Sequence, residues 1–157
     1  MPRFPFYKQL DAMDCGPSCL RMIAKHYGKN ISLQTIRDRS FLTREGVSFL
    51  GLSDAAESLG MRSVGARVSF QQLSDEIPLP AVVHWKDEHF VVVYGVKKGK
   101  VLVADPAFGL ISYKKEEFLK GWSGISDEKS AKGLVLIIEP TPDFYQLQDE
   151  KIDKSSF

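Results

Sequence analysis

The sequence predicts an α+β fold in which helices of the first half pack on an antiparallel sheet formed by the second half. Apolar residues recur at helical spacing after Cys15, namely at Cys19, Leu20, Ile23, Ala24 and Tyr27. From residue 81 to residue 105, by contrast, three valine-rich runs are separated by short turns, as in antiparallel strands. Helices followed by such strands are typical of the α+β class.

Three helices are expected before residue 60, over residues 15–28, 32–37 and 48–59. Asp14 is a candidate N-cap for the first, and Pro17 suits its first turn because that turn needs no backbone N–H. Ser32 can cap the second, and Gly60 is a stop signal for the third.

The rest of the chain alternates between strand patterns and two short helices. The expected strands are residues 61–68, 81–85, 89–96, 101–105, 110–113 and 134–138, and the expected helices are residues 69–73 and 114–120. Residues 97–100, Lys-Lys-Gly-Lys, form a hairpin turn on this interpretation rather than a patch for nucleic acid.

Composition and charge exclude several classes of protein. The chain has 157 residues, 43% hydrophobic and 26% charged, with a net charge of +1. This balance indicates one ordinary domain and gives no basic footprint for a nucleic-acid partner. The N-terminus lacks the apolar run of a signal peptide, and no apolar stretch approaches the ~20 residues of a membrane span. The two cysteines are interpreted as free thiols in a reducing cytosol.

One domain over residues 1–140 is predicted, because prolines and charges replace the apolar pattern after Pro140. Residues 141–157 are expected to be a flexible tail or linker.

The central hairpin brings a histidine and a carboxylate together. If Val96 pairs with Lys100, Asp105 lies opposite Val91, which shares a face with His89. Asp105 and His89 are then diagonal neighbours, about 7–8 Å apart along the backbone. A slip of one residue would place them on opposite faces.

These residues and Cys15 match the requirements of a cysteine hydrolase. A thiol at a helix N-terminus is favoured as the thiolate, which is the nucleophile. A histidine oriented by a carboxylate can accept the thiol proton and later deliver it to a leaving amine. The side-chain amide of Gln9, six residues before Cys15, and the Cys15 backbone N–H can stabilise the oxyanion.

Each of these residues also has a structural explanation. A cysteine that begins a helix is often a core residue, a histidine that opens a strand is often structural, and Asp105-Pro106 suits a turn. Cys15, Cys19 and His26 have neither zinc-site spacing nor a fourth ligand; Cys19 is expected in the core and His26 in solvent. His84 is expected on the opposite face from His89. For Trp122 a core position and a position beside the cleft both stay open.

The chain also resembles a known family over residues 5–140. Residues 9–28 (QLDAMDCGPSCLRMIAKHYG), His84-Trp85 with residues 89–93 (HFVVV), and residues 105–109 (DPAFG) look like the bacteriocin-processing peptidase domain of peptidase-containing ABC transporters. Phe118 with Trp122-Ser123-Gly124 is a weaker match.

This resemblance implies a papain-like fold and a defined activity. Such domains cleave leader peptides after Gly-Gly or Gly-Ala, and the mature bacteriocin, lantibiotic or pheromone is exported. Cys15 would be the nucleophile, His89 the general base, Asp105 its orienting partner and Gln9 the oxyanion donor. The leader would dock as an amphipathic helix on a hydrophobic surface, for which exposed apolar side chains among residues 33–68 are candidates.

The resemblance also implies partners outside this sequence. Family members continue into transmembrane and nucleotide-binding domains, so the chain is expected to be an excised domain, soluble in isolation. Its place would be the cytoplasmic side of the bacterial cell membrane. No cofactor is expected within it, since ATP would bind the separate nucleotide-binding domain. A non-catalytic leader-binding module and a stand-alone cysteine hydrolase of other specificity are the alternatives.

Overall fold

The computed structural model describes residues 3–40, 47–86 and 88–147. Within them, six strands form one sheet in the order β1-β6-β2-β3-β4-β5, with every neighbouring pair antiparallel. The strands are β1 (Met61–Ser69), β2 (Ala81–Trp85), β3 (His89–Lys97), β4 (Lys100–Asp105), β5 (Gly109–Lys114) and β6 (Lys132–Pro140). The predicted α+β class is confirmed.

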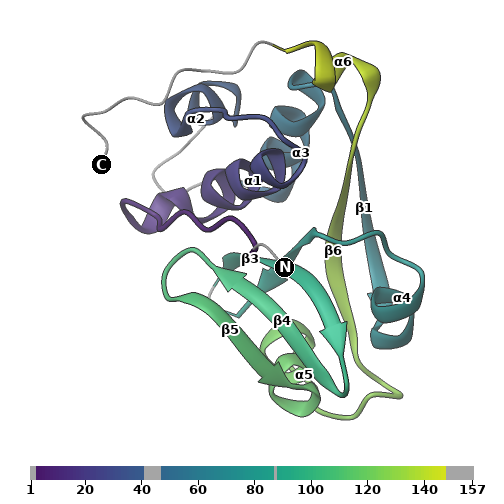
Figure 1. Cartoon of the computed structure of the whole chain (residues 1–157). Helices are drawn as coiled ribbons and strands as arrows, with labels where there is room; N and C mark the ends of the chain where they lie inside the picture. The colour runs from purple at the N-terminus through teal and green to yellow at the C-terminus, as the bar shows by residue number, and fades with distance from the viewer. Residues whose placement is uncertain (1–2, 41–46, 87, 148–157) are drawn as a thin grey trace.

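Helices cover both faces of this sheet. The helices are η1 (Ala12–Asp14), α1 (Cys15–His26), α2 (Leu33–Ser40), α3 (Phe49–Ser58), α4 (Phe70–Asp75), α5 (Lys115–Ser123) and α6 (Pro142–Gln146). Figure 1 shows α1, α2, α3 and α6 gathered at one end, with α4 and α5 beside the other end. The long strands β1 and β6 run between the two groups.

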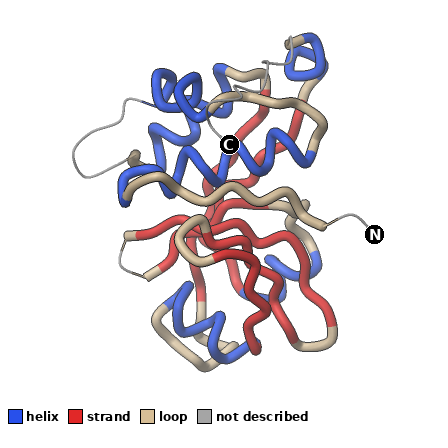
Figure 2. Tube along the Cα trace, turned by 60° about the vertical axis from the view of Figure 1, so that its left-hand side comes forward, coloured by secondary structure: helices blue, strands red, loops and turns tan. Residues whose placement is uncertain are grey.

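Two cores follow from this arrangement and from the alternation of side chains along the strands. Val92 of β3 packs with α1, α2 and α3, whereas Val91 and Val93 pack in the second core with α5. The same separation is visible in Figure 2, where helices lie on either side of the strands. The prediction that N-terminal helices pack on the sheet, as in papain-like proteins, is therefore correct for the first core. A second core, which includes α5, lies on the other face of the sheet.

Local signals placed the helix ends correctly. Ser48 Oγ accepts a hydrogen bond from the Gly51 N–H at 3.0 Å, and Ser32 Oγ accepts one from the Thr35 N–H at 3.1 Å. Gly60 ends α3 with a φ of 85°, in the left-handed region that favours glycine. The prediction for Asp14 is wrong in one respect, because its side chain makes no capping hydrogen bond.

The β3–β4 hairpin corrects the predicted register at its turn. Lys97, rather than Val96, pairs with Lys100, because Lys98 and Gly99 form a two-residue turn with φ values of 50° and 76°. Such turns match the twist of the flanking strands. A bulge between Val93 and Gly95 then shifts the pairing by one residue.

Beyond the bulge, the predicted register is restored. Val92 pairs with Ala104, and continuing this register by one residue would place Val91 opposite Asp105. The predicted placement of Asp105 is therefore correct, although the predicted turn was wrong by one residue. The extra residue in β3, Tyr94, compensates for the shorter turn.

Residues 141–147 correct the predicted domain end. They include α6, whose Phe144 is fully buried against the first core, and the Lys29 ammonium donates a hydrogen bond to the Leu147 carbonyl at 2.8 Å. This part of the predicted tail is folded, because Phe144 supplies an apolar side chain that the proline and charge pattern concealed. Residues 148–157 of the predicted tail lie outside the described residues.

Candidate active site

Cys15 is the first residue of α1, and 7% of its surface is exposed. The first N–H groups of a helix have no partner within it and present a partial positive charge. The predicted nucleophile therefore lies at the N-terminal end of α1, as the sequence indicated. Both Cys15 and Cys19 are free thiols, as predicted.

His89 and Asp105 are in direct contact at one end of the sheet. His89 opens β3 and Asp105 closes β4, so the antiparallel pairing brings the two residues to the same end. His89 Nε2 and Asp105 Oδ1 are 2.7 Å apart, and the Ala107 N–H donates to the same oxygen at 2.9 Å. The Asp105 side chain is only 3% exposed. The carboxylate is thus held from two sides and fixes the imidazole ring.

The surroundings of His89 favour its charged form. Burial by itself lowers the pKa, but hydrogen bonding to Asp105 and Cys15, together with their negative charges, outweighs burial and raises the pKa to about 9. An imidazolium at neutral pH is the partner that a Cys15 thiolate requires. Because Nε2 faces Asp105, Nδ1 is the nitrogen left for the thiol.

Gln9 lies in the N-terminal segment that runs beside the Asp105 turn. Its backbone N–H donates to the Pro106 carbonyl at 2.9 Å. Phe4 stacks on Tyr94 with ring centroids 4.6 Å apart, which holds the same segment against the sheet. The side-chain Oε1 of Gln9 is buried with no hydrogen-bond partner among the described residues.

Cys19 lies one helical turn after Cys15 but has a different environment. It is fully buried, and its thiol donates to the Phe90 carbonyl at 3.4 Å. Burial, followed by the charges of Cys15 and Asp105, raises its pKa well above the usual range. Cys19 therefore stays a neutral thiol in the core, as predicted.

One pair beside the site was missed by the sequence analysis. Asp14, directly before Cys15, is fully buried, and the Arg37 guanidinium contacts both of its carboxylate oxygens. Nothing in the local sequence around Arg37 distinguishes it from other basic residues on a helix surface. Only the packing of α2 on α1 reveals the pair.

The remaining sequence candidates lie elsewhere. His84 pairs with Phe90 and therefore faces the opposite side from His89, as predicted. Trp122 is 6% exposed in the second core, and its indole N–H donates to the Leu134 carbonyl at 3.0 Å. Of the two positions left open by the sequence, Trp122 therefore occupies the one in the core. His26 is exposed, as expected.

Residues 3–40, 47–86 and 88–147 contain neither a candidate metal site nor a candidate membrane-spanning helix. In these ranges, no three His, Cys, Asp or Glu side chains gather in a way that could hold a metal ion. None of the helices in the same ranges is long and apolar enough to cross a bilayer.

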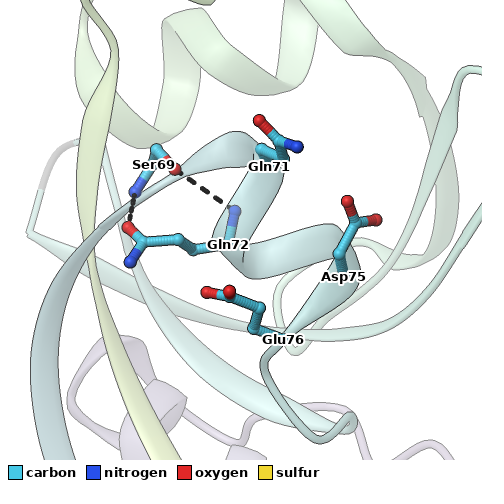
Figure 3. A pocket seen from close by; sticks show the side chains of 5 residues that line it. All are labelled: Ser69, Gln71, Gln72, Asp75 and Glu76. Carbon is cyan, nitrogen blue, oxygen red and sulfur yellow. Dashed lines mark hydrogen bonds between the residues drawn. The ribbon is translucent and has the colours of Figure 1, made fainter.

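Two surface hollows, one on α4 and one between the end of β2 and α5, are not lined by Cys15. One hollow of about 280 Å³ lies on α4, where Figure 3 shows the reciprocal hydrogen bonds of Ser69 and Gln72 that cap this helix. Asp75 and Glu76 complete its lining. Its polar side chains are explained by helix capping and solvent exposure.

Known proteins are similar to this chain over most of its length. The sequence profile of the Peptidase C39 family matches residues 3–126. The lactococcin-G-processing and transport ATP-binding protein of Lactococcus lactis subsp. lactis is 38% identical over 122 residues, which cover 74% of this chain and 17% of that protein. The colicin V secretion/processing ATP-binding protein of Escherichia coli is 33% identical over 126 residues, which cover 80% and 18%. The chain thus spans about a fifth of the length of these relatives.

Solved structures give the same assignment. A double glycine motif protease from an AMS/PCAT transporter, in complex with the leader peptide, superposes with a TM-score of 0.77 at 31% identity, covering 88% of this chain and 93% of that one. The peptidase domain of Streptococcus ComA gives a TM-score of 0.77 at 28% identity, covering 88% and 100%. The chain belongs to the peptidase C39 family.

Proposed function

We propose that this domain is a cysteine endopeptidase that cleaves the leader of a secreted peptide after Gly-Gly or Gly-Ala. The observation that carries the proposal is the contact of His89 with Asp105 at 2.7 Å beside the Cys15 thiol at the start of α1. A nucleophile, a general base and an orienting carboxylate are thereby present in one site.

The proposed reaction proceeds through an acyl-enzyme. The Cys15 thiolate attacks the carbonyl carbon after the second small residue, and the oxyanion receives hydrogen bonds from the Cys15 backbone N–H and the Gln9 side-chain amide. The His89 imidazolium gives its proton to the leaving nitrogen as the C–N bond breaks. Water, deprotonated by His89, then hydrolyses the thioester and releases the leader with a new carboxylate.

The requirement for small residues has a simple physical form. The proposal requires a channel beside the nucleophile that is too narrow for side chains larger than a methyl group, so that only glycine or alanine would bring the scissile carbonyl to Cys15. The relative solved in complex with its leader peptide is itself a double glycine motif protease, which supports this choice of bond.

The leader is proposed to dock on exposed apolar side chains of α3 and β1. Leu50 is 70% exposed and Val64 is 49% exposed, whereas Leu52, Met61 and Val68 of the same two elements are buried. The Phe49 ring lies against Gly65, which joins the two elements at this surface. Leu50→Glu should raise the KM for a full leader substrate severalfold and leave kcat unchanged; an unchanged KM would place the docking surface elsewhere.

We further propose that the domain works as part of a peptide exporter. The relatives are processing and transport ATP-binding proteins about five times its length. Transmembrane and nucleotide-binding domains would then be its partners, ATP would bind the latter, and the site would face the cytoplasm of the bacterial cell.

A cleavage assay separates this proposal from its alternatives. Cys15→Ala should abolish cleavage of a Gly-Gly leader peptide while leader binding is retained, and Cys19→Ala serves as the matched thiol control. Binding without cleavage by the parent domain would instead indicate a leader-binding module. Equal turnover of a Val-Val substrate would indicate a cysteine hydrolase of other specificity.

A further inference from the structure

A buried ion pair lies directly before Cys15. Arg37 Nε donates to Asp14 Oδ1 at 2.7 Å, and a second guanidinium nitrogen contacts Asp14 Oδ2, so the pairing is bidentate. The Asp14 side chain is fully buried, while 24% of the Arg37 side chain is exposed. Asp11, 3.8 Å from the same guanidinium and half exposed, is a weaker second partner.

The Asp14–Arg37 pair connects the start of α1, where Cys15 lies, to α2. Asp14 precedes the first residue of α1, and Arg37 comes from the last turn of α2. Asp14 makes no capping hydrogen bond, so its carboxylate is not needed to begin the helix. Its fixed partner is Arg37, which anchors the first turn of α1 from outside that helix.

The charge of the pair also bears on the thiolate. A buried carboxylate next to Cys15 would oppose a second negative charge on the sulfur. The bidentate Arg37 guanidinium compensates the negative charge of the Asp14 carboxylate, since arginine stays charged at every relevant pH. A change at either member would therefore leave an uncompensated charge one residue from Cys15, and the sign of that charge would differ between the two members.

We propose that Arg37 is a positioning residue for the peptidase reaction, which holds the first turn of α1 and neutralises Asp14 so that Cys15 can carry a negative charge. This inference deepens the proposed function and rests on it for the role of Cys15. Arg37 acts through Asp14, without contact to the substrate.

Other charged or titratable side chains in the described residues interact with Cys15, with its partner His89 or with the Asp14–Arg37 pair. They are Cys19 of α1, Asp11 before α1 and Asp105 of β4. The variants below change only Asp14 and Arg37, so the contributions of His89 and Asp105 are common to all of them.

The test measures the rate of alkylation of Cys15 by iodoacetamide against pH. This rate follows the thiolate population and requires no peptide. The proteins are the parent domain, Arg37→Gln, Asp14→Asn and the double variant. Arg39→Gln is the matched control, because Arg39 lies on the same helix but donates to the Ser58 carbonyl at 2.8 Å. Cys15→Ala supplies the blank for the buried Cys19.

The two single variants should shift the alkylation midpoint in opposite directions. Arg37→Gln should raise it by about one pH unit and Asp14→Asn should lower it by about as much, because each leaves one charge of the pair uncompensated. The double variant should return close to the parent, and Arg39→Gln should not shift. A change in packing alone would not reverse sign between the two.

Shifts in the same direction, or no shift in variants that melt at the parent temperature, would overturn the proposal. If Arg37→Gln does not fold, Asp14→Asn decides alone, and an unchanged or raised midpoint overturns it. Failure of the domain to cleave any Gly-Gly peptide would contradict the proposed function but leave the alkylation result for Arg37 intact.

Discussion

The negative charge of Asp105 is expected to set the alkaline limit of peptide cleavage. The active form requires imidazolium at His89, whose pKa is raised from 6.5 to about 9. Asp105→Asn removes the charge but keeps a side-chain oxygen that can accept from the Ala107 N–H, now 2.9 Å from Asp105 Oδ1. The geometry of the turn is thus preserved while the electrostatic contribution is lost.

The size of the effect follows from the pKa of His89. The rise from 6.5 to about 9 corresponds to roughly 3 kcal/mol in favour of the charged ring. Asp105 and Cys15 each supply a hydrogen bond and a negative charge, so about half of this is assigned to Asp105. The pKa of His89 in Asp105→Asn should then lie between about 7 and 8, and cleavage near pH 8.5 should fall roughly tenfold.

The assay is the pH dependence of kcat/KM for a Gly-Gly leader peptide. The parent should keep its activity up to about pH 9, whereas Asp105→Asn should lose it one to two pH units earlier, with a smaller change on the acidic side. Asp75→Asn, an exposed carboxylate change on α4, should leave the profile unaltered. An alkaline limb that stays near pH 9 in Asp105→Asn would refute this account of His89.

Three stability predictions follow from the same structure. The pKa of His89 in the folded protein is about 9, above its ordinary value of 6.5, so the charged ring contributes fully to the free energy of unfolding below about pH 6.5. This contribution is lost as the pH rises through about 9, and urea unfolding should show a decrease of up to roughly 3 kcal/mol in the free energy of unfolding over this window. His89→Gln should remove this pH dependence. Gly121→Ala should destabilise the fold by about 1–3 kcal/mol, since its Cβ would lie 2.3 Å from the Trp85 ring, whereas Gly16→Ala meets nothing nearer than 3.5 Å and should melt like the parent. Phe144→Ala should lower the free energy of unfolding in urea by about 3–5 kcal/mol, because the ring is fully buried. A decrease below about 1 kcal/mol would contradict the conclusion that α6 is part of the folded domain.

Helix boundaries were predictable because their signals are local. Ser32, Ser48 and Gly60 act on backbone groups within a few residues of themselves, so their roles can be inferred without knowing the fold. Asp14 shows the limit of such reasoning. Its position suits a cap, but burial against α2 gives its carboxylate a stronger partner in Arg37.

The hairpin shows how two errors of register can cancel. The turn at Lys98-Gly99 is one residue shorter than predicted, and the bulge at Tyr94 adds one residue to β3. Without the bulge, Asp105 would lie on the face opposite His89. Bulges depend on packing across the sheet, and the stacking of Phe4 on Tyr94 is a contact between segments ninety residues apart in sequence.

The sequence by itself determined the fold class, the starts of the helices and the residues Gln9, Cys15, His89 and Asp105 as candidates for one site. These follow from periodicity, turn chemistry and residue type, which act over short distances along the chain. The tertiary structure alone decided that His89 meets Asp105 at hydrogen-bond distance, that Arg37 pairs with Asp14, and that Phe144 packs in the first core. Each of these contacts joins segments distant in sequence, and its formation depends on how whole elements pack.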